Sequence, residues 1–420
     1  MLGTSTDNRI RGFSIKTLLT LEAHRLLEEG NEQGYEILKV LAVNGNFIMA
    51  KDLLKKKKGD DVPTGPSCYI CGSIFQKIDD IVEDIIKRVK KYEFNTFLVG
   101  SRVDVSILEK EDELRANMGL SYGESIKREI NREIGKKLQE KLGKKTDFEN
   151  PDLVILVVIS KDLSYEIDVK VNPIFIYGRY RKLIRGMPQS TWFCKKCGGK
   201  GCEECNWTGK KHQESVEALI TVPILDIVKG EDAIFHGAGR EDIDARMLGN
   251  GRPFIVEIKN PLKRFISLKE LEKYVNKYAK GKIEVKDLKW ASREDIRNLK
   301  ALSQVTAKVY RVLVETKKPV SEEALKKLEQ VLSGSTIKQR TPLRVIHRRA
   351  DKVRTKVVYE VKAQKIDDTH FELIIRCQGG LYVKELVSGD GGRTVPNVSE
   401  ILDNQAICVE LDVLDVESLT

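Results

Sequence analysis

Hydrophobic positions divide the chain into segments with different periodicities. In the first ~60 residues, leucines such as Leu19, Leu26 and Leu41 fall on one broad helical stripe, which ends in the lysine run 55–58 and the turn-forming sequence GDDVPTGP. We therefore expect a helical N-terminal extension, to which the sequence assigns no chemistry. In the next part of the chain, isoleucine or leucine recurs every four residues from 126 to 142, which predicts a long amphipathic helix with a basic outer face.

Strand patterns follow the long helix. The apolar run Leu153–Ile159 predicts a buried strand, and the alternation over Tyr165–Tyr177 predicts a sheet with one face on a core. Helices are predicted at Val216–Val228 and at Ser321–Leu332, where Ser321 is the expected N-cap. Further strands are predicted at Pro253–Ile258, Ala307–Val314, Lys356–Lys362, Glu372–Cys377 and Ala406–Val413. Because these elements do not alternate as βαβ units, the sequence predicts an α+β fold with a mixed, largely antiparallel sheet.

The Gly- and Cys-rich sequence GGKGCEECNWTGKK is the clearest break after the first strands. We place a domain boundary there. The expected organisation is a helical extension at 1–65, an accessory domain at 66–212 and a larger α+β domain at 213–420.

Positive charge is concentrated in two stretches. The chain has 420 residues, of which 41% are hydrophobic and 32% charged, and its net charge is +10. Residues 179–212 carry nine Lys and Arg against two Glu, and residues 338–356 carry eight against one Asp. Such stretches indicate a polyanionic partner, although solvated surface has the same composition.

The sequence contains no signal for a membrane. Its longest apolar run, Leu153–Ile159, is far shorter than the roughly 20 residues of a membrane span, and the N-terminus MLGTSTDNRIRGF has no apolar signal segment. We therefore expect a cytoplasmic protein without a membrane partner.

Six of the eight cysteines form CxxC pairs, a spacing that lets two thiolates bind one metal ion from a tight turn. The ion is expected to be a structural Zn²⁺, because a site of four sulfurs leaves no open position for catalysis. One arrangement uses the four cysteines of CKKCGGKGCEEC, and another joins the first pair to one later pair. The candidate ligands are Cys68, Cys71, Cys194, Cys197, Cys202 and Cys205.

The densest group of charged side chains lies in AGREDIDARMLGNGRPF, residues 238–254. Arginines and carboxylates crowd here among glycines that can bend the backbone, which is typical of a functional loop. A charged turn between a helix and a strand is the simpler interpretation. We expect Glu241 to face outward or to pair with an arginine.

Several motifs together resemble one enzyme family. GRED is similar to the GR-x-D loop that holds the aspartate of RNA pseudouridine synthases, and the longer string GREDIDARMLGNGRPF resembles the version in the archaeal and eukaryotic (Pus10-type) tRNA pseudouridine synthase family that acts on T-loop positions 54 and 55. AKVYRVLV, RTPLRVIHRRADKVR, GGLYVKEL and DGGRTVPNVSEIL resemble further motifs of that family in the same order. CYICGSIF and FIYGRYRKLIRGMPQSTW resemble its accessory domain, which contains a THUMP-like RNA-binding fold. The resemblance runs from about Cys68 to the C-terminus.

The resemblance implies a pseudouridine synthase fold with a central cleft, and a reaction without an organic cofactor. It assigns the catalytic carboxylate to Asp242, with Tyr310 stacked on the flipped uracil and Lys384 as the cationic partner. Asp244, two residues further on, is the rival carboxylate. The residues expected to contact substrate are Arg240, Tyr310, Arg344, His347, Arg348, Arg349 and Tyr382.

The function that the resemblance implies is isomerisation of uridine to pseudouridine at position 54, position 55 or both in the T-loop of tRNA. The expected partner is the T-arm, with no obligate protein partner. The alternative is a zinc-dependent tRNA-binding protein without activity, which the intact Asp242, Tyr310 and Lys384 disfavour. A THUMP-bearing methyltransferase or thiolation enzyme lacks support, because the sequence has neither a GxGxxG nucleotide loop nor a P-loop.

Overall fold

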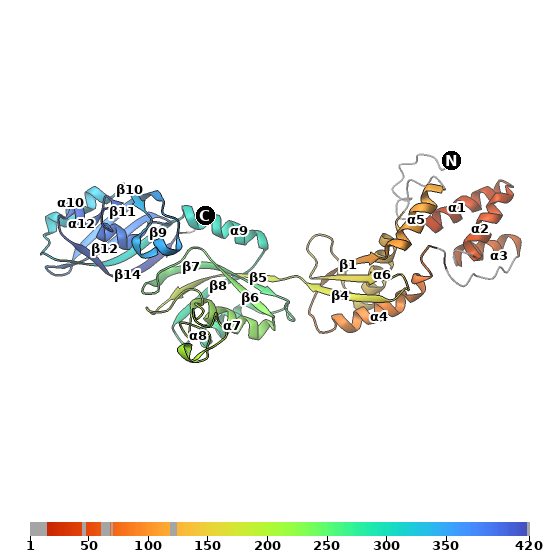
Figure 1. Cartoon of the computed structure of the whole chain (residues 1–420), viewed down its shortest axis with the longest axis horizontal. Coiled ribbons are helices and arrows are strands. Elements are labelled where there is room, and N and C mark those ends of the chain that lie inside the picture. Colours follow the sequence, from red (N-terminus) through yellow and green to blue (C-terminus); the bar gives the residue numbers. More distant parts are fainter. Residues whose placement is uncertain (1–14, 44–47, 60–67, 69, 118–123, 418–420) are drawn as a thin grey trace. The chain divides into compact units, whose positions relative to one another are not determined.

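The computed structural model describes residues 15–43, 48–59, 68, 70–117 and 124–417. The chain forms two compact units, Met1–Asn172 and Pro173–Thr420, each with its own sheet (Figure 1). No helix within the described ranges is long and apolar enough to cross a membrane.

The first unit begins with three helices that share a small core of their own. Leu19, Leu38 and Leu54 are buried between them, which explains the leucine stripe seen in the sequence. The helices are α1 (Ile15–Glu28), α2 (Glu32–Val43) and α3 (Ile48–Lys58). This confirms a helical segment at the N-terminal side of the chain.

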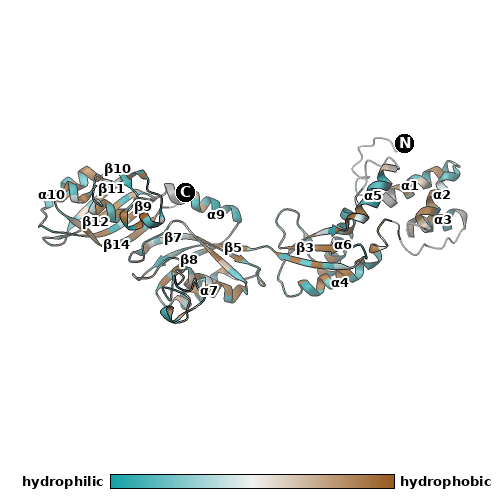
Figure 2. Cartoon of the chain, in the orientation of Figure 1, coloured by the Kyte–Doolittle hydropathy of each residue, from teal (hydrophilic) through white to brown (hydrophobic). Residues whose placement is uncertain are grey.

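The remainder of the first unit is a four-stranded sheet in the order β2-β1-β3-β4, covered by helices. Strand β3 (Leu153–Ile159) runs parallel to β1 and antiparallel to β4. The residues spaced by four lie on α6 (Ile126–Leu142), and Ile130, Ile134 and Leu138 are fully buried against the sheet, as predicted. Brown and teal residues alternate along α4, in keeping with one buried face (Figure 2). The other elements are η1 (Ile74–Lys77), α4 (Ile78–Val89), β1 (Thr96–Val103), α5 (Val105–Asn117), β2 (Lys145–Thr146) and β4 (Tyr165–Val171).

A ten-stranded mixed sheet forms the centre of the second unit. Its order is β13-β10-β11-β12-β9-β14-β7-β5-β8, with β6 paired to β7, and β14 and β7 are its parallel neighbours. This confirms a mixed, largely antiparallel sheet. The strands are β5 (Ile174–Lys182), β6 (Asp232–Gly237), β7 (Arg246–Lys259), β8 (Ile283–Ala291), β9 (Ala307–Thr316), β10 (Thr336–Arg340), β11 (Val353–Lys365), β12 (His370–Gln378), β13 (Thr394–Val395) and β14 (Ala406–Val416).

Helices pack on this sheet and enclose two hydrophobic cores. Ser321 caps α10 as predicted, since its hydroxyl accepts a hydrogen bond from the Ala324 backbone N–H. The helices are η2 (Glu203–Cys205), α7 (Val216–Val228), α8 (Leu268–Ala279), α9 (Arg293–Val305), α10 (Glu322–Leu332), η3 (Leu343–Arg348), α11 (Val383–Ser388) and α12 (Val398–Ile401).

The boundary expected at 212/213 lies instead at 172/173. The alternating stretch Tyr165–Tyr177 spans two strands, β4 and the beginning of β5, and β5 pairs with both β7 and β8 in the large sheet. Ile176 and Tyr180 on β5 are fully buried in the core of the second unit. The cysteine-rich loop that follows β5 therefore belongs to the second unit and not to the accessory domain.

The segment interpreted as one loop, residues 238–254, is a short loop followed by the beginning of β7. Gly249 lies in this strand at φ +52°, and a Cβ atom there would come within 1.7 Å of the Leu414 carbonyl oxygen. Glycine is required because β14 passes directly over this position.

We predict that a fragment of residues 173–420 folds cooperatively and that a fragment of residues 213–420 does not. The shorter fragment loses β5, which separates β7 from β8 in the sheet. Circular dichroism and thermal unfolding of both fragments measure this difference. A cooperative transition of 213–420 at the same temperature as 173–420 would show that β5 is dispensable.

Candidate active site

A pocket of about 1020 Å³ opens in the second unit where the loop 239–245 faces β9 and the start of α11. Its wall brings together side chains that lie more than a hundred residues apart in sequence. Of the predicted site residues, the pocket is lined by Arg240, Asp242, Tyr310, Arg344, Arg349, Tyr382 and Lys384.

Two predicted contact residues are not in this group. His347 lies on η3 with an exposed side chain and does not line the pocket. Arg348 follows it on the same short helix, but its side chain lies outside the described part of the structure.

Asp242 is held by two cations. Arg344 approaches both carboxylate oxygens, at 3.2 Å from Nη1 to Oδ1 and 3.1 Å from Nη2 to Oδ2, and Lys384 Nζ lies 3.6 Å from Oδ2. Both cations thus contact the carboxylate of Asp242 directly. The side chain of Asp242 remains 32% exposed, so a substrate can reach it from the pocket.

Arg344 was expected to contact phosphate, whereas the structure places it on Asp242. Glu385 fixes it there, because its carboxylate accepts a hydrogen bond of 2.6 Å from Arg344 Nε and is itself buried. The guanidinium also lies 6.0 Å from the ring centre of Tyr382. Arg344, one of the cations of the stretch 338–356, therefore contacts the carboxylate of Asp242 directly.

Lys384 lies closer to Asp244 than to Asp242. The ammonium donates a hydrogen bond of 2.6 Å to Asp244 Oδ2, and 60% of the Asp244 side chain is exposed. Burial opposes ionisation of this carboxyl, but the hydrogen bond from Lys384 outweighs it and lowers its pKa. Lys384 thus bridges the two aspartates, and Asp242 is the less exposed of the two and has the additional contact with Arg344.

Below the loop lies a buried ion pair. Glu241 has no exposed side-chain surface and accepts hydrogen bonds from Arg252 Nε at 2.8 Å and from the Tyr180 hydroxyl at 2.8 Å. Arg252 also donates to the Ala238 carbonyl at 2.9 Å, and Gln189 donates to Tyr180 and to the Gly239 carbonyl. Glu241 therefore pairs with an arginine and does not face outward.

Lys182, the last residue of β5, holds the loop 239–245 from the other side through hydrogen bonds. Its fully buried ammonium donates to the carbonyls of Met187, Asp242 and Ile243 at 2.8 to 3.1 Å. Burial lowers the pKa of Lys182, since the acceptors are neutral carbonyls. The backbone of Asp242 is thus anchored directly to the central sheet.

Tyr310 lies on β9 and packs against two of the hydrophobic cores of the second unit. Its ring is half-buried and lines the pocket. Burial raises the pKa of its phenol, with a smaller contribution from the nearby Cys377 thiol, so the hydroxyl stays neutral at physiological pH. A neutral aromatic ring held between two cores can stack on a planar base.

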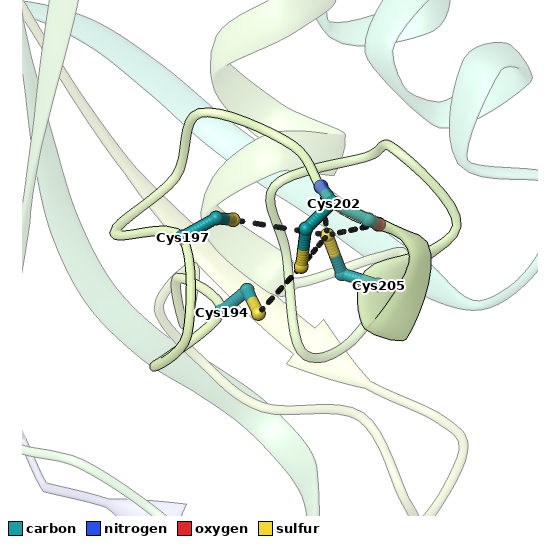
Figure 3. A group of neighbouring side chains, drawn as sticks. All are labelled: Cys194, Cys197, Cys202 and Cys205. Carbon is teal, nitrogen blue, oxygen red and sulfur yellow. Dashed lines mark hydrogen bonds between the residues drawn. The ribbon is translucent and has the colours of Figure 1, made fainter.

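Cys194, Cys197, Cys202 and Cys205 point toward one another from two short loops (Figure 3). Their sulfur atoms all lie within 4.8 Å of one another, and the pairs Cys194–Cys202, Cys197–Cys205 and Cys202–Cys205 are 3.7 to 3.9 Å apart. Burial raises the pKa of the Cys205 thiol, but backbone N–H groups that donate to its sulfur prevail and lower it to about 6. This donor set can hold a metal ion.

Cys68 and Cys71 do not belong to this cluster. They are buried in the core of the first unit, and no group of metal-binding side chains within the described residues includes them. The alternative in which this pair joins a later pair is therefore not what the structure shows.

The base of the cysteine loop reaches the pocket. Phe193 and Lys210 form an isolated β-bridge that closes the loop, and Trp192 beside them lines the pocket wall. The guanidinium of Arg240 lies 6.0 Å from the centre of the Trp192 ring. The cysteine loop and the loop 239–245 are therefore in contact through this pair.

Comparison with known proteins identifies the family. The model of the Pus10 C-terminal domain matches residues 175–417, and that of the archaeal Pus10 THUMP domain matches residues 81–157. The tRNA pseudouridine synthase Pus10 of Methanocaldococcus jannaschii is 45% identical over 98% of this chain and 88% of its own length. The chain belongs to the Pus10 family. Its relative of the same name in Methanothermobacter marburgensis is 48% identical over 84% of this chain and 86% of its own.

Membership of the Pus10 family makes the chain a pseudouridine synthase, an isomerase. The first strand of the C-terminal family model is β5, in agreement with the boundary at 172/173. Among solved structures, a chain of a Cbf5-Nop10-Gar1 complex shares 16% identity and a TM-score of 0.33 over 57% of this chain and 47% of its own, a similarity too weak to add to this assignment.

Sequence reasoning on the Pus10 family motifs missed the groups that support the site. Tyr180, Lys182 and Gln189 lie in the string FIYGRYRKLIRGMPQSTW, which the resemblance assigned to the accessory domain, and they meet the GRED motif through hydrogen bonds that no local pattern announces. Glu385 could have been suspected, because it follows Lys384 directly in the same motif. Lys308 could also have been found, because it lies two residues before Tyr310 and strand periodicity puts both on one face.

We predict that Glu241→Gln lowers the free energy of unfolding by about 3 kcal/mol, because it leaves the buried charge of Arg252 without its counter-ion. Chemical denaturation measures the change. Glu315→Gln, an exposed carboxylate on β9, is the matched control and should change stability by less than about 0.5 kcal/mol. Equal effects of the two substitutions would contradict a supporting role for the ion pair.

Proposed function

We propose that this enzyme isomerises uridine to pseudouridine in the T-loop of tRNA, at position 54, position 55 or both, with Asp242 as the catalytic carboxylate. The observation that carries the proposal is the position of Asp242 in the pocket, between Arg344 and Lys384 and opposite Tyr310. The names of the Pus10 relatives support tRNA as the substrate.

The reaction needs one carboxylate at the ribose and a site that retains the free base. The C1′–N1 bond of the target nucleotide breaks, the uracil turns, and C1′ joins to C5. An ionised Asp242 can add to C1′ or take a proton from the sugar, and both are roles that a carboxylate performs. Arg344 and Lys384 hold its side chain in place beside the phosphates of the RNA.

A uridine within a folded RNA must leave its stack before it enters the pocket, at a cost of a few kcal/mol. The rim of the pocket supplies cations that can bind the flanking phosphates, among them Arg240 and Arg349, which are both exposed. The half-buried Tyr310 provides a ring for the extruded base. The pocket thus combines an aromatic platform, a carboxylate and a positive rim.

Zn²⁺ fits the four-cysteine cluster. Tetrahedral Zn–S bonds of about 2.3 Å place the sulfur atoms roughly 3.8 Å apart, and the sulfur atoms here are 3.7 to 3.9 Å from their neighbours. Four thiolates fill the coordination sphere, so the ion would stabilise the loop and take no part in the reaction. Through the base of the loop it would hold Trp192 in the pocket wall.

We predict that Asp242→Asn abolishes pseudouridine formation and leaves tRNA affinity within about threefold, because binding is distributed over many phosphates. Pseudouridine mapping on an unmodified tRNA transcript, together with a binding assay, measures both properties. Asp244→Asn is the matched control and should retain part of the rate. Turnover by Asp242→Asn combined with loss in Asp244→Asn would assign the chemistry to the other aspartate.

We predict one zinc per chain by elemental analysis of the protein without substrate. Replacement of both Cys194 and Cys197 by Ser should remove the metal, lower the melting temperature and weaken tRNA binding, since the loop would lose its cross-link. Replacement of both Cys68 and Cys71 by Ser is the control and should leave the zinc content at one. Zinc retained in the first variant, or lost in the second, would refute this ligand set.

A further inference from the structure

Two cations that line the pocket have buried side chains, Arg252 and Lys308. Arg252 is neutralised by Glu241, as described above. Lys308 is 6% exposed, and among the described residues its ammonium group has neither a hydrogen bond nor an ion pair. An ammonium group that is almost buried and has no protein acceptor depends on water or a ligand in the pocket to supply one, so Lys308 is placed to bind an acceptor that enters the pocket.

The location of Lys308 is set by β9. Lys308 and Tyr310 are two residues apart on one strand, so their side chains leave the same face about 6.6 Å apart. On the loop side, the ammonium nitrogen lies 3.2 Å from the place where a Cβ atom on Gly239 would be. Gly239 has φ +83°, and a side chain there would meet both Lys308 and Arg252. The loop therefore leaves room beside the ammonium group.

The different burial of Asp242 and Lys308 indicates how a nucleotide would be oriented in the pocket. Asp242 is 32% exposed and acts on the ribose, whereas Lys308 is almost fully buried. A base that is attached to a ribose at Asp242 and stacked on Tyr310 directs its far edge toward the deeper wall. On that edge lies O4, opposite N1, while O2 lies beside N1; both carbonyl oxygens of uracil are hydrogen-bond acceptors.

We propose that Lys308 is a catalytic residue that donates a hydrogen bond from its ammonium group to a carbonyl oxygen of the target uracil and stabilises the charge on the detached base. The proposal rests on the proposed function, since it takes this pocket as the place where uridine is isomerised.

The charge arises from the bond that breaks. When C1′–N1 is cleaved, its electron pair stays on N1 and spreads to the two carbonyl oxygens of the uracil, while Asp242 compensates the electron loss at the sugar. After the base turns, an electron pair at C5 forms the new bond to C1′. The C5 proton then leaves to a base, and N1 gains one proton, so the product has the composition of the substrate. A cation at a carbonyl oxygen stabilises the state between the two bonds.

The surroundings of Lys308 suit this role. Burial lowers its pKa to about 8, and the neighbouring charges of Arg252 and Lys356 act in the same direction, against Glu241 and the Cys377 thiol. Lys308 is thus still mostly protonated at neutral pH. Its positive charge has no hydrogen-bond acceptor among the described residues until a ligand provides one. Such an ammonium group gains most from an oxygen that becomes negative during the reaction.

The experiment compares single-turnover rates on tRNA whose target nucleotide is uridine, 2-thiouridine or 4-thiouridine, each with tritium at C5. Release of the C5 proton reports the reaction for all three. Sulfur accepts hydrogen bonds weakly, so we expect one thio substitution to slow the wild-type enzyme roughly tenfold or more. In Lys308→Met the rate on uridine should fall roughly ten- to hundredfold at saturating tRNA, and the same thio substitution should cost nothing further.

Lys362→Met, which removes an exposed lysine from β11, is the matched control and should behave as the wild type. If Lys308→Met does not fold, Lys308→Gln and the wild-type thio series still test the proposal. It is overturned if neither thio substitution slows the wild type, if the thio cost persists in the variant, or if the variant loses tRNA affinity but keeps its rate, which would place Lys308 on a phosphate. Failure of the wild type to isomerise any tRNA uridine would refute the proposed function instead.

Discussion

The buried ion pair between Glu241 and Arg252 is the interaction on which the active site depends. Glu241 precedes Asp242 directly, so any movement of the glutamate displaces the catalytic loop. Two charges removed from water are stable only when each is compensated, and here the Tyr180 hydroxyl and the Ala238 carbonyl complete the compensation. The ion pair thus fixes the buried side of the loop 239–245, while the side chain of Asp242 lines the pocket on its other side.

The side chains that support and line the site come from strands of the central sheet that are remote in sequence. Tyr180 and Lys182 come from β5, Arg252 from β7, and Tyr310 and Lys308 from β9. Alternation along each strand directs these polar groups to the side that also carries the hydrophobic core, so core packing sets their positions. Rigid strands are a better support for reacting groups than loops, because their hydrogen-bond ladders resist displacement.

The two ends of the pocket have different electrostatic designs. At the mouth, Asp242, Asp244 and Glu385 are interleaved with Arg344 and Lys384, so each charge has a partner before RNA arrives. At the floor, Lys308 has none among the described residues. A ligand that enters would exchange some of the contacts at the mouth, whereas at Lys308 it would add a contact and break none. The cysteine loop meets the loop 239–245 through Trp192 and Arg240.

The sequence by itself determined the α+β class, the long amphipathic helix, the capped helix after Ser321 and the identity of the motifs around Asp242, Tyr310 and Lys384. These follow from local periodicity and from short strings of residues, which a single chain displays directly. The sequence also offered the four neighbouring cysteines as a metal site, but it left open whether Cys68 and Cys71 contribute to that site.

Only the tertiary structure decided where the second unit begins, because β5 looks like a continuation of β4 until its partners β7 and β8 are known. It also decided that Arg344 belongs to Asp242, that Glu241 is buried, and that Lys308 has no partner among the described residues. Such facts depend on which side chains meet across strands distant in sequence, and charge alone is compatible with an exposed loop as well as with a buried pair. Pairing between remote strands is the physical information that a linear pattern does not contain.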